Sequence, residues 1–94
     1  MNKSEAEEVL KHYMDQYREK PYGKLVTLMD NVQVYEVEGS SGARYTLEFN
    51  VMWDGKTKDD IRVIGAIDDG TLRNAFSPLS DDFILTPDGR FVGE

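Results

Sequence analysis

Polar and apolar residues alternate along the stretch Arg44–Asp54, and this alternation is the strongest structural signal in the chain. Successive side chains of a β-strand point to opposite faces of its sheet, so the pattern predicts a strand with one buried and one wet face. The apolar row consists of Tyr45, Leu47, Phe49, Val51 and Trp53. The other row is polar except for its methionine and consists of Arg44, Thr46, Glu48, Asn50, Met52 and Asp54. We expect the rest of the chain to pack on the apolar row.

Apolar residues with helical spacing come earlier, in residues 4–19. They form one stripe of Ala6, Val9, Leu10, Tyr13 and Tyr17, with Met14 at its flank. Spacings of three and four residues place side chains on one face of a helix, so the stripe predicts an amphipathic helix. Ser4 and Glu7 have the spacing of a capping box, which predicts the N-terminal end of this helix. Pro21 and Gly23 predict that it ends before them.

Two segments follow before the alternating strand. Lys24–Met29 is mostly apolar, which predicts either a short buried strand or a further helical turn. Val32–Glu38 predicts a strand, but its apolar residues change parity along its length. This change predicts a bulge, or Tyr35 and Val37 exposed near a sheet edge. The Gly-Ser-Ser-Gly sequence that comes next predicts a hairpin turn into the alternating strand.

The C-terminal half predicts a further strand and a hairpin. Ile61–Ile67 is apolar on both parities, so we expect a third strand with both faces partly covered. Gly65 within it predicts a bulge or the close approach of another group. Phe83–Val92 predicts a hairpin around Thr-Pro-Asp-Gly, because Pro presets the turn and Gly accepts positive φ. Between them, Thr71–Ser80 predicts either irregular chain or a short pairing segment.

Together these elements predict a single α+β domain over residues 1–94. An N-terminal helix precedes an antiparallel meander of about four strands, and this helix is large enough to cover the apolar face of the sheet. In its element order the chain resembles the cystatin-like α+β group, which includes the nuclear-transport-factor-like domains. The resemblance implies a helix lying across a curved sheet. Because element order and not a residue motif carries it, the resemblance implies no site residues.

An acidic composition limits the partners of the chain. The formal net charge is −7, and the eleven Lys and Arg residues are spread singly along the sequence. Nucleic acids and anionic membranes are bound by clustered cations, so we expect neither as a partner. A basic protein partner fits the charge. The sequence has no cysteine, no apolar signal segment and no apolar run of about 20 residues, from which we expect a cytoplasmic protein.

Acidic pairs are the clearest candidates for chemistry. Asp59–Asp60, Asp68–Asp69 and Asp81–Asp82 offer carboxylates for a divalent cation or for proton transfer. All three pairs lie at predicted turns or strand ends, where local hydrogen bonds favour Asp. His12 is the one histidine and falls on the exposed side of the predicted helix, and the sequence has no Gly-rich phosphate loop. We therefore expect no catalytic residue, no metal and no cofactor.

Aromatic residues and the polar row give two candidate sites. A pocket for a small apolar ligand beneath the helix would be lined by residues that otherwise form core, namely Tyr13, Tyr17, Phe49 and Trp53. An interaction face would consist of Tyr35, Arg44, Thr46, Glu48, Asn50 and Met52.

Three functions follow from these sites. The leading hypothesis is a non-enzymatic protein-binding or self-associating module, with a homodimer formed through a sheet face or edge. The second is a small-ligand carrier or enzyme that uses a helix–sheet cavity and an acid such as Glu48 or Asp54. The third is an acidic inhibitor or immunity-type protein that binds a basic partner through complementary charge.

Overall fold

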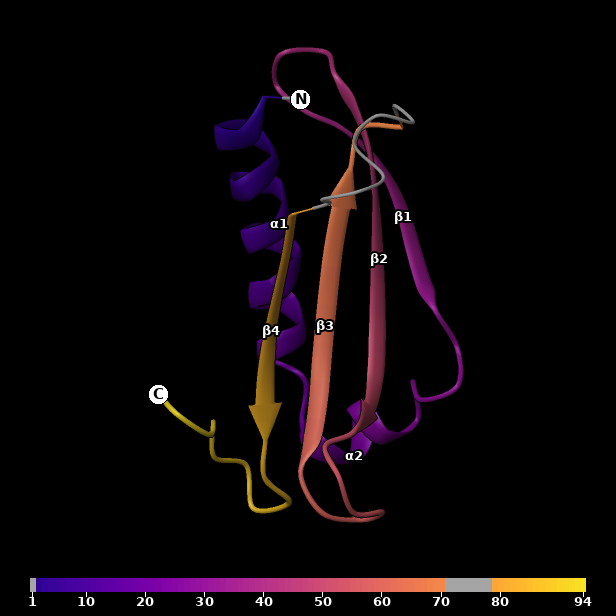
Figure 1. Cartoon of the computed structure of the whole chain (residues 1–94), viewed down its shortest axis with the longest axis vertical. Coiled ribbons are helices and arrows are strands. Elements are labelled where there is room, and N and C mark those ends of the chain that lie inside the picture. The colour runs from indigo at the N-terminus through magenta and orange to yellow at the C-terminus, as the bar shows by residue number, and fades with distance from the viewer. Residues whose placement is uncertain (1, 71–78) are drawn as a thin grey trace.

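A helix packed on a four-stranded antiparallel sheet forms the fold, as the computed structural model shows (Figure 1). The structure describes residues 2–70 and 79–94. Its elements are α1 (Lys3–Arg18), α2 (Tyr22–Val26), β1 (Gln33–Glu38), β2 (Arg44–Trp53), β3 (Ile61–Asp68) and β4 (Leu79–Leu85). The strands follow one another in space as they do in sequence, each antiparallel to its neighbour. The predicted α+β class is confirmed, while the cystatin-like grouping stays a prediction.

The apolar row of β2 forms the centre of the core, as its alternation predicts. Tyr45, Leu47, Phe49 and Val51 are at most 5% exposed, and Trp53 at the strand end is half-buried. Burial of side chains of this size contributes roughly 1.5–3 kcal/mol each before conformational entropy is counted. β2 can carry this core because it is an inner strand, paired with β1 on one side and with β3 on the other.

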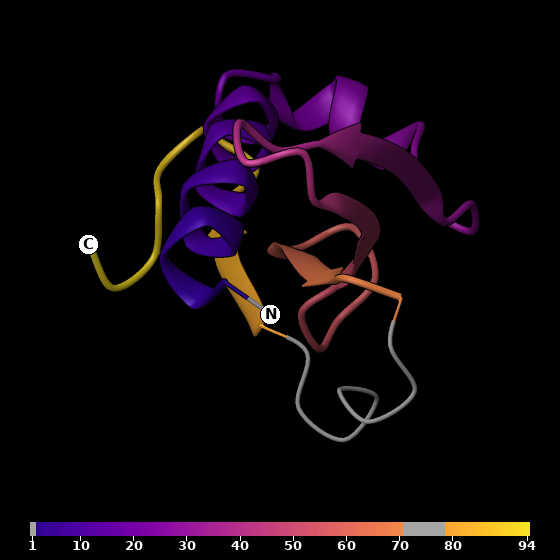
Figure 2. The same ribbon diagram turned by 90° about the horizontal axis from the view of Figure 1, so that it is seen from above.

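The buried face of α1 is turned further toward Met14 than the apolar stripe predicts. Its buried apolar residues are Ala6, Leu10, Met14 and Tyr17, with Val9 and Tyr13 half-buried. The cause is tertiary, because α1 packs mainly over β3 and β4 (Figure 2). The side of the helix that faces these two strands is therefore shielded from solvent, and Met14 lies at the middle of that side.

The N-terminal end of α1 also differs from the prediction. Asn2 caps the helix, and its Oδ1 accepts a hydrogen bond from the backbone N of Glu5 at 3.1 Å. The predicted capping box of Ser4 and Glu7 is therefore wrong. Asn and Ser are about equally good caps, so local sequence alone does not choose between Asn2 and Ser4.

The first half of the ambiguous segment Lys24–Met29 lies in a second helix, α2. α2 begins after Pro21, whose fixed φ is compatible with the start of a helix, and it buries Leu25 completely. The following residues Thr27 and Leu28 continue as turns, each donating its backbone N–H to a carbonyl three residues back.

β1 is an edge strand, as predicted, but its faces are the reverse of the prediction. Tyr35 and Val37 are half-buried against the core, while Val34 is 55% exposed. The pairing of β1 with β2 is continuous, so the predicted bulge and the exposed Tyr35 are both wrong. The hydroxyls of Tyr35 and Tyr17 lie 2.8 Å apart and form a hydrogen bond, which ties the edge strand to α1.

Gly65 of β3 marks a close approach and not a bulge. The register of β3 against both neighbours is continuous through this residue. A Cβ atom at Gly65 would lie 2.5 Å from Cε1 of Phe49, so the glycine leaves room for that ring.

The predicted C-terminal hairpin is present in a minimal form. Leu85 pairs with Phe91 in a single bridge, and the backbone N of Val92 donates to the carbonyl of Ile84 at 2.9 Å. The undetermined segment Thr71–Ser80 lies outside the described residues except for its last two, which begin β4. Neither described helix has the length and hydrophobicity needed to cross a membrane.

Substitution of Gly65 by Ala is expected to destabilise the fold by about 1–3 kcal/mol, because the added methyl group overlaps the buried Phe49 ring. Gly23→Ala is the matched control. It lies in α2 with open space around it, so we expect it to be neutral or stabilising by up to about 1 kcal/mol. Urea denaturation of the two variants and the wild type measures both effects. Equal stability of Gly65→Ala and the wild type would contradict the close packing.

Candidate functional site

The polar row of β2 lies on the sheet face turned away from α1. We call this surface the outer face. Its residues on β1 and β2 are Val34, Glu36, Glu38, Arg44, Thr46, Glu48, Asn50 and Met52. On β3 and β4 they are Arg62, Ile64, Ala66, Asp68, Ser80, Asp82 and Ile84. In the part of the chain that the structure describes, no helix packs on this face.

Five of the six residues of the predicted interaction face lie on the outer face, all of them from β2. Tyr35 is the exception, since it points to the core side of β1. The sequence misplaces Tyr35 because the valines of β1 fit either parity, whereas in the structure Tyr35 contacts the core rings of Tyr13, Tyr17 and Phe49.

Apolar side chains from β3 and β4 extend the outer face beyond the predicted residues. Ile64 is opposite Asn50 in the register, and Ala66 is opposite Glu48. Met52, which is 40% exposed, lies diagonal to Ile64 on one side. Ile84, which is half-buried, lies diagonal to Ile64 on the other side. The second apolar parity of β3 is the sequence signal for this patch, but it does not show which parity faces solvent.

Carboxylates lie among these apolar residues. Together with Asp54 at the end of β2, the outer face carries six acids, Glu36, Glu38, Glu48, Asp54, Asp68 and Asp82. The same face carries two guanidinium groups, those of Arg44 and Arg62, so its net charge among the described residues is −4. Apolar and charged side chains thus alternate across this surface, with Glu48 between Val34 and Ala66 and with Arg62 between Met52 and Ile84.

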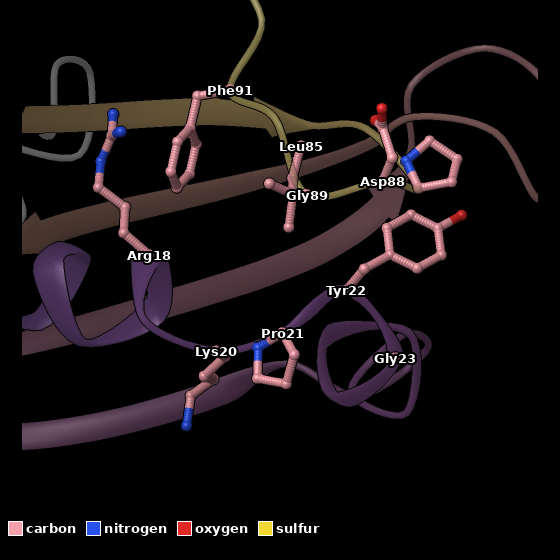
Figure 3. Close-up of a pocket in the computed structure, with 10 residues that line it drawn as sticks. Arg18, Lys20, Pro21, Tyr22, Gly23, Leu85, Asp88, Gly89 and Phe91 are labelled. Carbon is pink, nitrogen blue, oxygen red and sulfur yellow. The ribbon is translucent and has the colours of Figure 1, made fainter.

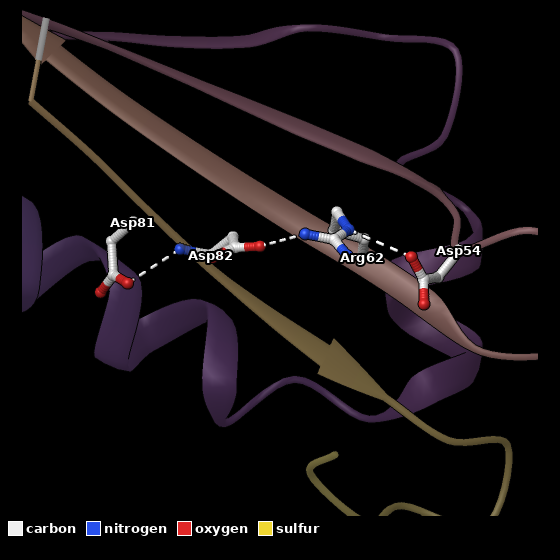
Figure 4. A network of polar contacts seen from close by, with 4 residues as sticks. All are labelled: Asp54, Arg62, Asp81 and Asp82. Atoms are coloured by element: carbon white, nitrogen blue, oxygen red, sulfur yellow. Dashed lines mark hydrogen bonds and ion pairs between the residues drawn. The ribbon is translucent and has the colours of Figure 1, made fainter. Parts of the chain in front are cut away.

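Arg62 lies in an ion-pair network across three strands (Figure 4). Its Nε donates to Oδ1 of Asp54 at 3.1 Å, and its Nη1 donates to Oδ2 of Asp82. The hydrogen bond to Asp54 and the charges of both acids raise the pKa of Arg62 above its usual value. The backbone N of Asp82 in turn donates to Oδ1 of Asp81 at 2.8 Å. Because Arg62 is neutralised within the sheet, it does not oppose the approach of a cationic group.

Three of the four predicted pocket residues, Tyr13, Tyr17 and Phe49, pack together. The rings of Tyr17 and Phe49 are stacked with centroids 4.3 Å apart and planes 9° apart, and Tyr13 lies 6.4 Å from Phe49. Burial raises the pKa of Tyr17. Trp53 lies half-buried at the far end of β2. This contact between rings supports a core role for the first three, and their role as ligand-binding residues stays a hypothesis.

Glu5 is a functional position that sequence reasoning missed. Its carboxylate is only 9% exposed and accepts hydrogen bonds from the hydroxyls of Tyr45 at 2.7 Å, Ser41 at 2.7 Å and Ser40 at 3.1 Å. The backbone N of Ser41 donates as well, at 2.8 Å. Gly39 fits beneath this carboxylate, since a Cβ atom there would lie 2.7 Å from Glu5. One side chain of α1 therefore holds the β1–β2 hairpin loop, and helical periodicity gives no signal for it.

Titration of Glu5 reflects these contacts. The hydrogen bonds from Tyr45 and Ser41 lower the pKa of Glu5 from 4.5 to about 2. The same bond to the carboxylate raises the pKa of Tyr45 to about 12. Glu5 is thus held as an anion at every pH near neutrality, which suits an anchor and not a proton donor.

One surface pocket lies where the C-terminal segment meets the corner between α1 and α2 (Figure 3). It has a volume of about 450 Å³, with Arg18 beside Phe91 at one end and Tyr22 at the other. The Arg18 guanidinium pairs with Glu94 at 2.7 Å and lies 5.0 Å from the Phe91 centroid. The Tyr22 hydroxyl donates to the carbonyl of Asp59 at 2.6 Å. The polar groups at both ends are therefore occupied by the chain itself, and we assign this pocket a structural role.

Among residues 2–70 and 79–94, no three His, Asp or Glu side chains converge as a metal site would require. His12 is exposed on α1 and contacts Gln16, with Nε2 of each side chain 3.1 Å apart. The acidic pair Asp81–Asp82 takes part in the network around Arg62.

Comparisons with known proteins assign this chain to no family. No protein-family model matches the chain, and no curated protein or solved structure matches it significantly.

Replacement of Glu5 by Gln is expected to lower stability near neutral pH, because an amide offers one acceptor oxygen to four donors. The folded pKa of about 2 lies below the usual 4.5, so the stabilisation is complete above pH 4.5 and is lost as the pH falls toward 2. We expect the urea midpoint of the wild type to exceed that of Glu5→Gln at pH 7, and the two midpoints to converge between pH 4.5 and 2.

The control for this experiment is Glu7→Gln, an exposed residue in the same part of α1, which should match the wild type at pH 7. A difference between wild type and Glu5→Gln that stays constant down to pH 2 would rule out the carboxylate as the source of the stabilisation.

Proposed function

We propose that this protein is a non-enzymatic binding module whose outer face receives a basic partner protein. The observation that carries the proposal is that apolar side chains and six carboxylates lie together on one sheet face that no described helix covers. Protein interfaces combine apolar contacts with polar and charged ones. Apolar side chains gathered on a surface mark such sites more strongly than single exposed ones do.

Charge supports a basic partner in particular. The net charge of −4 on the outer face would attract lysine and arginine side chains and speed their encounter with it. Arg62 does not oppose them, because Asp54 and Asp82 hold its guanidinium. The partner that fits best has apolar groups to cover Met52 and Ile64 and cations beside them.

Self-association through the same face is the weaker alternative. Two copies would bring two surfaces of net charge −4 together, which costs free energy unless salt screens it. Sedimentation of the pure protein in low and high salt distinguishes the two cases. A dimer that is stable at low salt would favour self-association over a basic partner.

A charge reversal on the outer face tests the proposal directly. We expect the double variant Glu48→Lys/Met52→Lys to weaken binding of the partner at least tenfold, about 1.4 kcal/mol, because it removes one carboxylate, adds two ammonium groups and removes an apolar contact. The control Glu7→Lys/Gln16→Lys makes the same change in net charge on exposed positions of α1. It should bind as the wild type does.

The measurement has two steps. Immobilised wild type, face variant and control capture proteins from lysate of the host cells in about 50 mM salt, and each captured protein is then identified, purified and titrated against all three. A basic protein that is bound by wild type and control and lost with the face variant supports the proposal. Partners that bind all three proteins equally would contradict it.

A further inference from the structure

The outer edge of β1 presents unpaired backbone groups at alternate residues. The backbone N of Gly39 donates to the carbonyl of Ala43 at 2.7 Å, which closes the β1–β2 hairpin with a hydrogen-bonded pair. Hydrogen-bonded and non-hydrogen-bonded pairs alternate along an antiparallel ladder. Counting back from Gly39, the backbone N–H and C=O groups of Val34, Glu36 and Glu38 point away from β2. In the described chain β1 has β2 as its one neighbouring strand, so these groups face the free edge (Figure 1).

The two sides of this edge differ in chemistry. Val34, Glu36 and Glu38 place exposed side chains on the outer face. Tyr35 and Val37 point to the core side and are only half-buried, because α1 packs mainly over β3 and β4. A strand added along this edge would therefore meet carboxylates on one side and incompletely covered apolar groups on the other.

A groove of about 390 Å³ lies on the core side of the edge, between α1 and the C-terminal end of β1. Its apolar lining is provided by Val9, Tyr13 and Val37, and the titratable residues that also line it are Glu5, Glu8, His12 and Glu38. Figure 2 shows the end of β1 coming close to α1, where this groove is formed. Glu5 fixes the hairpin loop at the same place, so the groove is bounded by an anchored segment.

We propose that an extended segment of the basic partner pairs with the edge of β1 as a fifth strand. This inference rests on the proposed function and names the part of the partner that binds. Main-chain hydrogen bonds to Val34, Glu36 and Glu38 hold the segment, as in other cases of strand addition. Its alternate side chains are Lys or Arg on the outer face, opposite Glu36 and Glu38, and apolar on the core side, where they enter the groove.

A second copy of this chain does not fit the edge. Pairing β1 with β1 would bring the acidic residues Glu36 and Glu38 of both copies close together, and like charges on adjacent strands destabilise a sheet. Charged edge residues are a general means of preventing such self-pairing. The same two acids select a strand of opposite charge.

The test uses a synthetic heptapeptide, Lys-Val-Lys-Val-Lys-Val-Lys with blocked ends, as the probe. Its lysines and valines alternate as the site requires. We expect titration into the labelled protein to shift the backbone amide NMR signals of Val34, Glu36 and Glu38 more than those of Met52 and Ile64. Two control peptides are the same design with Glu in place of Lys, and a peptide with four lysines followed by three valines, which lacks the alternation. Both should bind at least tenfold more weakly.

Two protein variants separate edge pairing from general attraction. Val34→Pro removes a backbone N–H that points to the free edge and leaves the bonds of β1 to β2 in place, and proline is tolerated on edge strands in this orientation. Glu36→Lys/Glu38→Lys reverses the charge without changing the backbone groups. Each should weaken binding of the alternating peptide at least tenfold, while thermal unfolding followed by circular dichroism verifies that each variant is folded.

The outcomes distinguish this inference from the proposed function. If Val34→Pro is folded and binds the alternating lysine peptide as the wild type does, strand addition is overturned, while the preference for a basic partner stands. Should the Glu-containing peptide bind as tightly as the Lys-containing one, the charge preference fails and the proposed function fails with it. Loss of binding in both variants, with shifts centred on β1, supports the added strand.

Discussion

The stack of Tyr17 on Phe49 joins the helix to the sheet, and much of the remaining structure depends on it. The two rings lie 4.3 Å apart and nearly parallel, and both are almost fully buried. Gly65 leaves the space that Phe49 needs on β3, and the Tyr17 hydroxyl bonds to that of Tyr35 on β1. Four elements, α1, β1, β2 and β3, thus meet around one aromatic contact, which combines large apolar burial with a defined ring geometry.

A single long helix covers only one face of a four-stranded sheet, so the other face stays exposed to solvent. The covered face forms the core by apolar packing. On the outer face, side chains of Ile64, Ala66 and Ile84 lie between charged neighbours, and the Asp54–Arg62–Asp82 network spans the strand ends. The outer face therefore combines exposed apolar side chains with a net negative charge, and no buried polar side-chain atom is left without a partner in the described residues.

Glu5 connects the helix to the edge of the sheet. A carboxylate with little solvent needs several donors, and the β1–β2 loop and Tyr45 supply four of them. This contact sets where β1 ends relative to α1, and with it the shape of the groove beside the free edge. In the proposed complex Glu36 and Glu38 have two effects, because they would attract a basic segment and would disfavour pairing of the edge with its own copy.

Local patterns in the sequence were sufficient to predict the elements whose periodicity is unambiguous. Strict alternation in β2 determined its buried row and placed five residues on the outer face, because a strand has only two sides. Helical spacing determined α1, and Gly65 predicted either a bulge or a close approach, of which the close approach of the Phe49 ring is present. The turn chemistry after Leu85 likewise determined the small C-terminal hairpin.

Tertiary structure decided the rest, wherever local chemistry offered two equal choices. Asn2 and Ser4 are comparable caps, and the structure uses Asn2. The valines of β1 fit either face of the sheet. The observed orientation of β1 places Tyr35 in a hydrogen bond with Tyr17, a contact between residues far apart in sequence. The position of α1 over β3 and β4 made Met14 central, left β1 half-covered and opened the groove beside it. Such features depend on which elements lie side by side, and periodicity within one segment carries no information about its neighbours in space.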